Sequence, residues 1–155
     1  MATYYHFRRS HRNPGDVIDL TMRSMLELYE HGANTNPWRL VCELALEEQR
    51  LRLRPEAVSR IDCRFVFRTE EDALRQIYRM SGSKFLFEVE FTEPAAPTFT
   101  GDFDLMSTLF TMDGARFLPK VRAVAESYWR GTITGTPEVL TASNLRVIRT
   151  ARAFA

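Results

Sequence analysis

The stretch Cys63–Phe91, CRFVFRTEEDALRQIYRMSGSKFLFEVEF, holds two strand patterns separated by a helix pattern. Cys63–Phe67 and Phe85–Phe91 are short, apolar and rich in aromatic residues, which is typical of strands. Between them, Thr69 followed by three acidic residues predicts a helix N-terminus, because Thr caps free amides and acids interact well with the helix dipole. The stretch therefore predicts a strand–helix–strand unit, with Gly82 ending the helix.

Two helices near this unit have recognisable apolar positions. The capped helix is expected to bury Ala73, Leu74, Ile77 and Tyr78. An earlier helix is expected to begin at Asn36-Pro37, with N-cap and first-turn residues of the usual kind. Its predicted apolar stripe is Leu40, Val41, Leu44 and Leu51, and its predicted solvated face is Glu43, Glu47, Glu48 and Arg50.

The remaining chain supplies more strands and helices around this unit. The expected elements are a strand at 3–8, a turn at 13–16, a helix from Asp19 to Gly32, a helix or covering segment at 102–110, a helix at 117–129, and strands at 138–140 and 145–149 paired as a hairpin around Ser143-Asn144. This order favours an α+β fold with a mainly antiparallel sheet and helices covering its sides. We expect one domain over residues 1–155.

Composition narrows the class of protein. The chain has 155 residues, 45% of them hydrophobic and 26% charged, as in folded proteins. Lys and Arg number 21 against 20 Asp and Glu, so the total charge suggests neither a nucleic-acid nor a membrane partner. No secretion signal or membrane span is apparent, and we expect a cytoplasmic protein. Cys42 and Cys63 are expected to be buried thiols, and no metal site is expected.

Several common catalytic motifs are absent from the sequence. No GxGxxG follows a strand, and the chain has no P-loop, no GxSxG elbow and no HExxH. Asp102 and Asp104 form a carboxylate pair on an expected flexible loop, which is a weak sign of a site. Tyr128 and Trp129 are expected to be packing residues, and Ser59-Arg60 is expected to be a solvated loop.

Four pieces of the sequence, in this order, resemble the ADP-ribosyltransferase superfamily, particularly its small bacterial members. That family opens with a strand carrying Tyr-His, follows with an aromatic strand and a capped helix, and presents a catalytic glutamate on a late strand. The matching pieces are Tyr4-Tyr5-His6-Phe7-Arg8, the run Arg64–Ala73, the strand Phe85–Glu90, and Tyr128–Gly131 leading to Pro137-Glu138-Val139-Leu140. The resemblance implies a split antiparallel sheet of ADP-ribosyltransferase type.

The resemblance also implies a chemistry and a set of site residues. Transfer from NAD⁺ breaks the glycosidic bond to nicotinamide through a transition state with oxocarbenium character, which a carboxylate stabilises. Glu138 is the expected catalytic residue, and His6 is expected to bind a ribose diol. Arg8 is expected to contact the pyrophosphate, and Phe65 or Phe67 to stack on nicotinamide. Many members of the family have Ser or Thr in place of Arg8 and Tyr in place of Phe65.

These expectations leave three functions open. The first is an NAD-dependent mono-ADP-ribosyltransferase, such as a toxin or effector with an antitoxin partner, whose acceptor is a protein, a nucleic acid or a small molecule. The second is a catalytically inactive relative that uses the same cleft to bind a nucleotide or a partner protein. The third is an Arg-rich RNA-binding domain, which the balanced charge disfavours.

Overall fold

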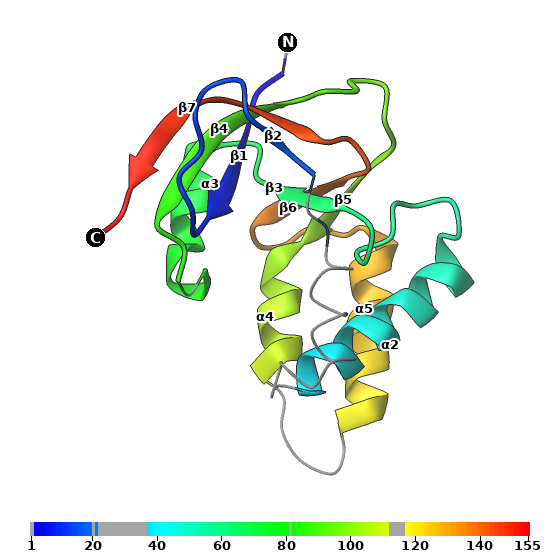
Figure 1. Ribbon diagram of the computed structural model, residues 1–155. Coiled ribbons are helices and arrows are strands. Elements are labelled where there is room, and N and C mark those ends of the chain that lie inside the picture. The colour runs from blue at the N-terminus through cyan, green and yellow to red at the C-terminus, as the bar shows by residue number, and fades with distance from the viewer. Residues whose placement is uncertain (1, 20, 22–36, 81, 112–116) are drawn as a thin grey trace.

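The computed structural model describes residues 2–19, 21, 37–80, 82–111 and 117–155 (Figure 1). Its architecture is mixed α+β, as predicted, with every described strand pairing antiparallel. Most of the helix expected from Asp19 to Gly32 lies outside the described residues. The described helices and strands are β1 (Tyr4–Arg8), β2 (Val17–Ile18), α2 (Pro37–Leu53), β3 (Arg64–Val66), α3 (Glu70–Arg75), the 3₁₀ helix η1 (Ile77–Arg79), β4 (Phe85–Phe91), β5 (Thr98–Asp102), α4 (Phe103–Thr111), α5 (Phe117–Arg130), β6 (Pro137–Thr141) and β7 (Leu145–Ala153).

The described strands form two sheets that meet at one point. One sheet has the order β1-β4-β7-β2 and the other the order β3-β6-β5. They are joined by a bridge between Tyr5 and Phe67, whose backbone groups exchange two hydrogen bonds of 2.9 Å. The β1 strand of the first sheet and the β3 strand of the second are therefore neighbours at the junction.

Apolar side chains from both sheets fill the space between them. Val66 of β3 and Val139 of β6 share a buried cluster with residues of β4 and β7, including Phe87, Val89 and Val147. Because neighbouring residues of a strand point to opposite faces, Phe65 and Leu140 lie on the other face of the three-stranded sheet.

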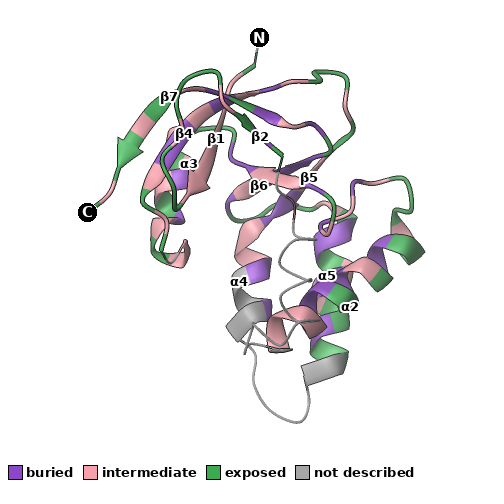
Figure 2. Cartoon of the chain, in the orientation of Figure 1, coloured by how far each residue is buried: buried purple, intermediate pink, exposed green. Residues whose placement is uncertain are grey.

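Three helices cover that second face. Figure 1 shows α2, α4 and α5 grouped on one side of the three-stranded sheet, and Figure 2 shows buried positions on each of these helices. Tyr128 and Trp129 of α5 are fully buried there, as predicted, and the Trp129 indole donates to the Leu46 carbonyl at 2.7 Å. Cys42 and Cys63 are also buried and unbonded to each other, as expected.

The predicted apolar stripe of α2 is wrong in part. Leu44 and Leu51 are 52% and 58% exposed, whereas Glu43 and Arg50, placed on the solvated face, are buried. The reason is that this helix buries Cys42, Ala45 and Leu46 together with charged side chains that have partners inside the fold.

The strand–helix–strand unit is confirmed, but its helix is shorter than predicted. Thr69 caps α3 by accepting from the Asp72 amide at 3.0 Å. The α-helix ends at Arg75 and continues as η1, which changes the face it buries. Gln76 is therefore buried and hydrogen-bonded to Thr136, while Tyr78, expected to face inward, is 71% exposed.

The predicted hairpin of the last two strands is also wrong. β6 pairs with β3 and β5, whereas β7 pairs with β4 and β2, so the two strands belong to different sheets. Ser143 between them is buried, and its hydroxyl accepts from the Glu93 amide. This hydrogen bond holds the segment in which the chain passes from one sheet to the other. The strand β5 was not predicted, although it pairs with β6 along its whole length.

We predict that Gly101→Ala destabilises the fold, because a Cβ at Gly101 would lie 2.3 Å from the Tyr128 ring. Overpacking of this kind costs about 1–3 kcal/mol, which urea unfolding would measure. Thr98→Ala, at an exposed position of the same strand, is the control and is expected to cost about 0.5 kcal/mol. Equal losses in the two variants would contradict the close packing at Gly101.

Candidate functional site

The predicted site residues lie on three strands at the junction of the sheets. His6 and Arg8 are on β1, Phe65 is on β3, with Phe67 directly after it, and Glu138 is on β6. β1 meets β3 at the Tyr5–Phe67 bridge, and β3 pairs with β6 from Arg64 to Val66. The topology thus brings together segments far apart in the sequence, although their side chains do not all point to the same place.

His6 is held in a defined neutral form. Its Nδ1 donates to the Phe65 carbonyl at 2.7 Å, so the ring spans the gap between β1 and β3. Burial lowers the pKa of His6 to about 4, against the raising effect of the Phe65 carbonyl, with Arg8 lowering it further. Its Nε2 is then a buried acceptor without a hydrogen-bond partner among the described residues.

Arg8 lies two residues further along β1, in partly buried surroundings. Desolvation and the nearby charge of Arg12 lower the pKa of Arg8, and Asp19 opposes this effect. The Nε of Arg8 is buried and has no partner in the part of the chain that the structure describes. Arg8 therefore offers a donor beside His6.

The two phenylalanines have different surroundings. Phe67 is buried in a cluster with Ala73 and Leu86 and meets Phe103 edge to face, so its ring is part of the core. Phe65 is partly buried, packs on the helix-covered face, and has the guanidinium of Arg60 4.7 Å from its ring centre.

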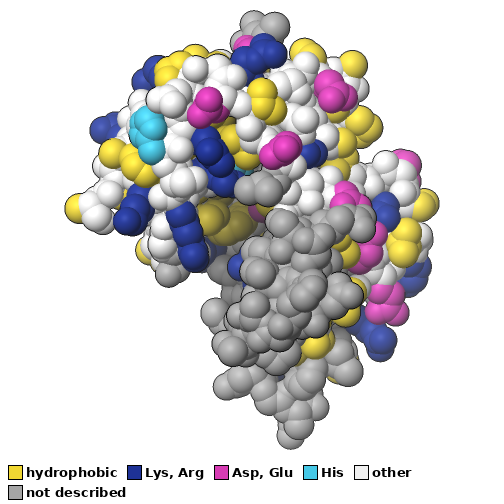
Figure 3. Space-filling view, viewed as in Figure 1, with side chains coloured by type: hydrophobic (Ala, Val, Ile, Leu, Met, Phe, Trp, Pro, Cys, Tyr) yellow, Lys and Arg dark blue, Asp and Glu magenta, His cyan; other side chains and the backbone are white. Residues whose placement is uncertain are grey.

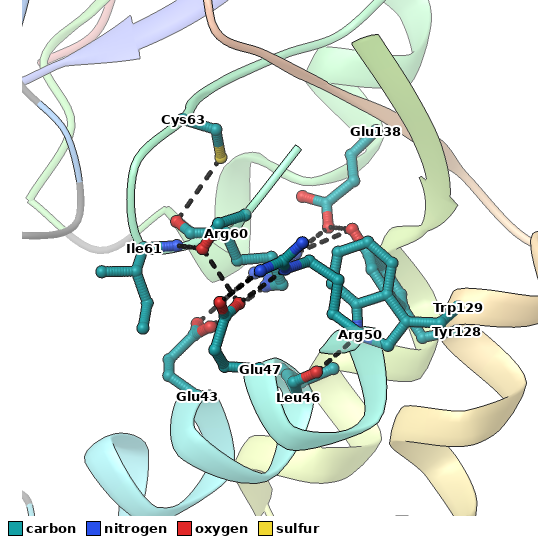
Figure 4. Close-up of polar contacts among 11 residues, drawn as sticks. Glu43, Leu46, Glu47, Arg50, Arg60, Ile61, Cys63, Tyr128, Trp129 and Glu138 are labelled. Carbon is teal, nitrogen blue, oxygen red and sulfur yellow. Dashed lines mark hydrogen bonds and ion pairs between the residues drawn. The ribbon is translucent and has the colours of Figure 1, made fainter. Parts of the chain in front are cut away.

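Glu138 lies in a buried polar cluster on the helix-covered face of the sheet (Figure 4). Its Oε1 accepts from Arg60 Nη1 at 2.5 Å and from the Tyr128 hydroxyl at 2.8 Å. Arg60 also contacts Glu43 of α2, with 3.1 Å between Nε and Oε2. Glu43, Glu138 and Arg60 are each at most 3% exposed, so one guanidinium serves two carboxylates away from water. We call these three residues and Tyr128 the Arg60 cluster.

The ionisation of the cluster follows from this geometry. Burial disfavours the charged form of Arg60, but the carboxylates of Glu138 and Glu43 outweigh it and raise the pKa of Arg60 well above its usual value. Burial and the neighbouring Glu138 charge raise the pKa of Tyr128 well above its usual value, so the phenol stays a neutral donor.

Sequence reasoning missed the role of Arg60 and Glu43. Arg60 was expected in a solvated loop and Glu43 on a solvated face, and both predictions are wrong. Neither residue belongs to a recognisable motif, since one precedes a strand and the other is a charge in a helix. The pairing depends on α2 lying beside the start of β3, which the sequence does not encode locally.

A second pair of carboxylates fixes the loop before Glu138. Asp102 Oδ2 accepts from the amides of Thr134 and Gly135, each at 2.9 Å, and Asp104 Oδ2 accepts from the Thr136 amide at 2.8 Å. A Cβ at Gly135 would lie 2.1 Å from Asp104 Oδ2. The expected pair on a flexible loop is therefore an ordered clamp that positions the start of β6.

We predict that Arg60→Met destabilises the protein strongly, because it leaves Glu43 and Glu138 buried without their cation. Breaking a buried pair on one side costs about 3–5 kcal/mol, which chemical denaturation would measure. Arg122→Met is the control, since Arg122 and Glu48 form a pair that is 56% and 55% exposed. Its loss is expected to cost about 0.5 kcal/mol, and a similar cost at Arg60 would contradict the cluster's burial.

We predict that His6 makes stability depend on pH below neutrality. The pKa of folded His6 is about 4, against 6.5 for an ordinary His, so only the unfolded chain takes up this proton between those values. The contribution is fully present above pH 6.5 and is lost toward pH 4, by at most roughly 3 kcal/mol. Unfolding series between pH 4 and 7.5 should show a shallower slope in His6→Gln than in the control His11→Gln, an exposed position. An unchanged slope in His6→Gln would contradict the assignment.

Comparison with known proteins gives a family and no function. No curated protein matches the chain. Among the residues that the structure describes, no helix is long and apolar enough to cross a membrane. A protein family described as "Protein of unknown function (DUF2441)" matches residues 20–153, which is most of the chain. The protein therefore belongs to the DUF2441 family.

Proposed function

We propose that the protein is an NAD-dependent mono-ADP-ribosyltransferase with its donor site where β1 and β3 part. The observation that carries the proposal is the buried Nε2 of a neutral His6, which has no hydrogen-bond partner among the residues that the structure describes. A buried acceptor costs free energy unless it is satisfied, and a ribose hydroxyl would donate to it. His6 binds one ribose in this proposal, and Arg8 binds the adjacent phosphates.

The order of the strands also supports the proposal. The resemblance to ADP-ribosyltransferases requires the first strand, the aromatic strand and the late glutamate strand to be close in space. β1, β3 and β6 are consecutive neighbours through the Tyr5–Phe67 bridge and the β3–β6 pairing. Two sheets of three and four strands that meet at this bridge are in keeping with a split sheet of ADP-ribosyltransferase type.

Glu138 is the proposed catalytic residue, and its contacts suggest how it would act. Both Arg60 and Tyr128 donate to Oε1, and Oε2 takes part in neither contact. We assign Oε2 to the hydroxyl of the ribose from which nicotinamide leaves. A carboxylate there stabilises positive charge on the ribose as the glycosidic bond breaks. Phe65, rather than the core residue Phe67, is the aromatic side chain that remains for stacking.

One observation favours a second function, the inactive binding module. Glu138 is 1% exposed and ion-paired to Arg60, so its carboxylate reaches a substrate only if the surrounding side chains move. A protein that uses Glu138 for stability alone would still offer His6 and Arg8 to a nucleotide.

Release of nicotinamide from NAD⁺ tests the proposal directly. We expect the purified protein to release nicotinamide, Glu138→Gln to reduce the rate at least 100-fold because a neutral amide does not stabilise the developing charge, and His6→Ala to raise KM. His11→Ala is the matched control and should keep the wild-type rate. Circular dichroism would establish that each variant is folded.

The outcomes separate the two functions. NAD⁺ binding without release, with the same affinity in Glu138→Gln, would support the inactive module. Neither binding nor release by the folded wild-type protein would contradict both functions.

A further inference from the structure

Arg8 of β1 and Arg64 of β3 both lie near Asp19, whose carboxylate acts on Arg8 and whose carbonyl accepts from Arg64 Nη2 at 2.7 Å. Because the Tyr5–Phe67 bridge is antiparallel, Arg8 of β1 and Arg64 of β3 lie on the same side of the bridge along the two strands. Between these two ends lies His6, whose ring joins the strands through the Phe65 carbonyl where the backbone bridge has ended. The two guanidinium-bearing strand ends thus flank the same opening.

A third arginine belongs to this group. The charge of Arg12, in the loop after β1, acts on Arg8 strongly enough to lower its pKa, so the two guanidinium groups are near each other. Like charges brought together in partly buried surroundings repel one another unless an anion lies between them. We call Arg8, Arg12 and Arg64 the arginine triad.

Each member of the triad has a buried donor that no other described residue satisfies. The Nε atoms of Arg8, Arg12 and Arg64 are buried and lack a hydrogen-bond partner within the described part of the chain. Arg64 is held in place by two carbonyls, with Nη1 donating to Ala142 at 2.8 Å and Nη2 to Asp19 at 2.7 Å. These contacts orient its guanidinium and do not themselves supply a negative charge, because carbonyl oxygens are uncharged.

The acidic neighbours of the triad differ from those of the arginines on β7 in the described part of the chain. Of the described residues, Asp19 is the acidic one that acts on Arg8. By contrast, the arginines of β7 have acidic partners on neighbouring elements, with Arg146 on Glu90, Arg149 on Glu88 and Arg152 on Glu70. The triad therefore differs from the paired arginines elsewhere on the surface.

We propose that the arginine triad is a diphosphate-binding site, in which Arg12 and Arg64 join Arg8 in holding the phosphates of a nucleoside diphosphate. Guanidinium groups from two sides match the oxygens of two linked phosphates, and each forms charge-assisted hydrogen bonds. Figure 3 shows Lys and Arg side chains gathered around a hollow on the face that carries the C-terminal end of β1. The neutral Nε2 of His6 lies beside the triad and suits the ribose that follows the phosphates.

This inference rests on the proposed function only in one respect, namely that the complete nucleotide bound at the site is NAD⁺. A nucleoside diphosphate and free pyrophosphate present the same chemistry, and the test separates them. If the triad is specific for the nucleotide, ADP binds more tightly than pyrophosphate, because only ADP also offers a ribose to His6. If pyrophosphate binds as well as ADP, the phosphates alone are recognised.

Calorimetric titration with ADP tests the triad. We expect Arg8→Met and Arg64→Met to weaken ADP binding roughly tenfold or more, since each removes a charged hydrogen-bond donor. Arg122→Met removes the same charge from an exposed pair on α5 and should leave the dissociation constant within about twofold. Adenosine, which lacks phosphates, should bind wild type and Arg64→Met equally.

Folding defects need a separate control, because Arg64 also donates hydrogen bonds to the carbonyls of Ala142 and Asp19, which its substitution would remove. Arg64→Lys keeps one donor and the charge, and should give an intermediate affinity for ADP. Arg8→Met removes no hydrogen bond given by the described structure, so it tests the site if Arg64→Met fails to fold. Thermal unfolding of every variant identifies the folded ones.

Two results would overturn the proposal. One is ADP binding in Arg8→Met and Arg64→Met that is no weaker than in Arg122→Met, and the other is wild-type binding of ADP no tighter than of adenosine. The result is separate from that of the proposed function: tight ADP binding without nicotinamide release contradicts the transferase alone. Release that survives substitution of the triad contradicts the diphosphate site, including the phosphate contact proposed for Arg8, and leaves the transferase activity standing.

Discussion

The buried guanidinium of Arg60 joins α2, α5 and β6 inside the fold. It contacts Glu43 of α2, Glu138 of β6 and, through the same Nη1, the Tyr128 hydroxyl of α5. Removing two carboxylates from water is unfavourable unless a cation and hydrogen bonds compensate. The position of α2 against the three-stranded sheet therefore has to satisfy electrostatics as well as packing. A shift of α2 along the sheet would separate Glu43 from Arg60, and a shift of α5 would separate Tyr128 from Arg60 and Glu138.

This constraint has a second effect at the junction of the sheets. Holding Glu138 from one side, the Arg60 cluster fixes β6 on the helix-covered face, while the Asp102–Asp104 clamp fixes the loop before it. His6 fixes β1 to β3 through a single side-chain contact. The candidate site thus lies between the paired strands β3 and β6 on one side and β1 on the other. β1 is joined to β3 by the Tyr5–Phe67 bridge and by the His6 imidazole.

The sequence indicated more of the fold than of the site. Strands with strong aromatic content, such as Phe85–Phe91, and the capped start of α3 were predictable, since both signals are local. The separation of β6 and β7 into different sheets was not, because a short connection normally predicts a hairpin and only long-range pairing decides otherwise. Arg60 and Glu43 were placed in solvent because an isolated charge is usually exposed. Their burial follows from partners that are 17 and 78 residues away from Arg60 along the chain.

The clamp before Glu138 limits how this stretch can vary among relatives. Since a Cβ at Gly135 would collide with the carboxylate of Asp104, positions 104 and 135 are not free to change independently. A side chain at 135 would require a shorter residue at 104, and that change would leave the Thr136 amide without its acceptor. The two positions should therefore change together in an alignment, or the glycine should persist wherever the aspartate does. Covariation of this pair would report on the geometry of β6 in family members whose structures are unknown.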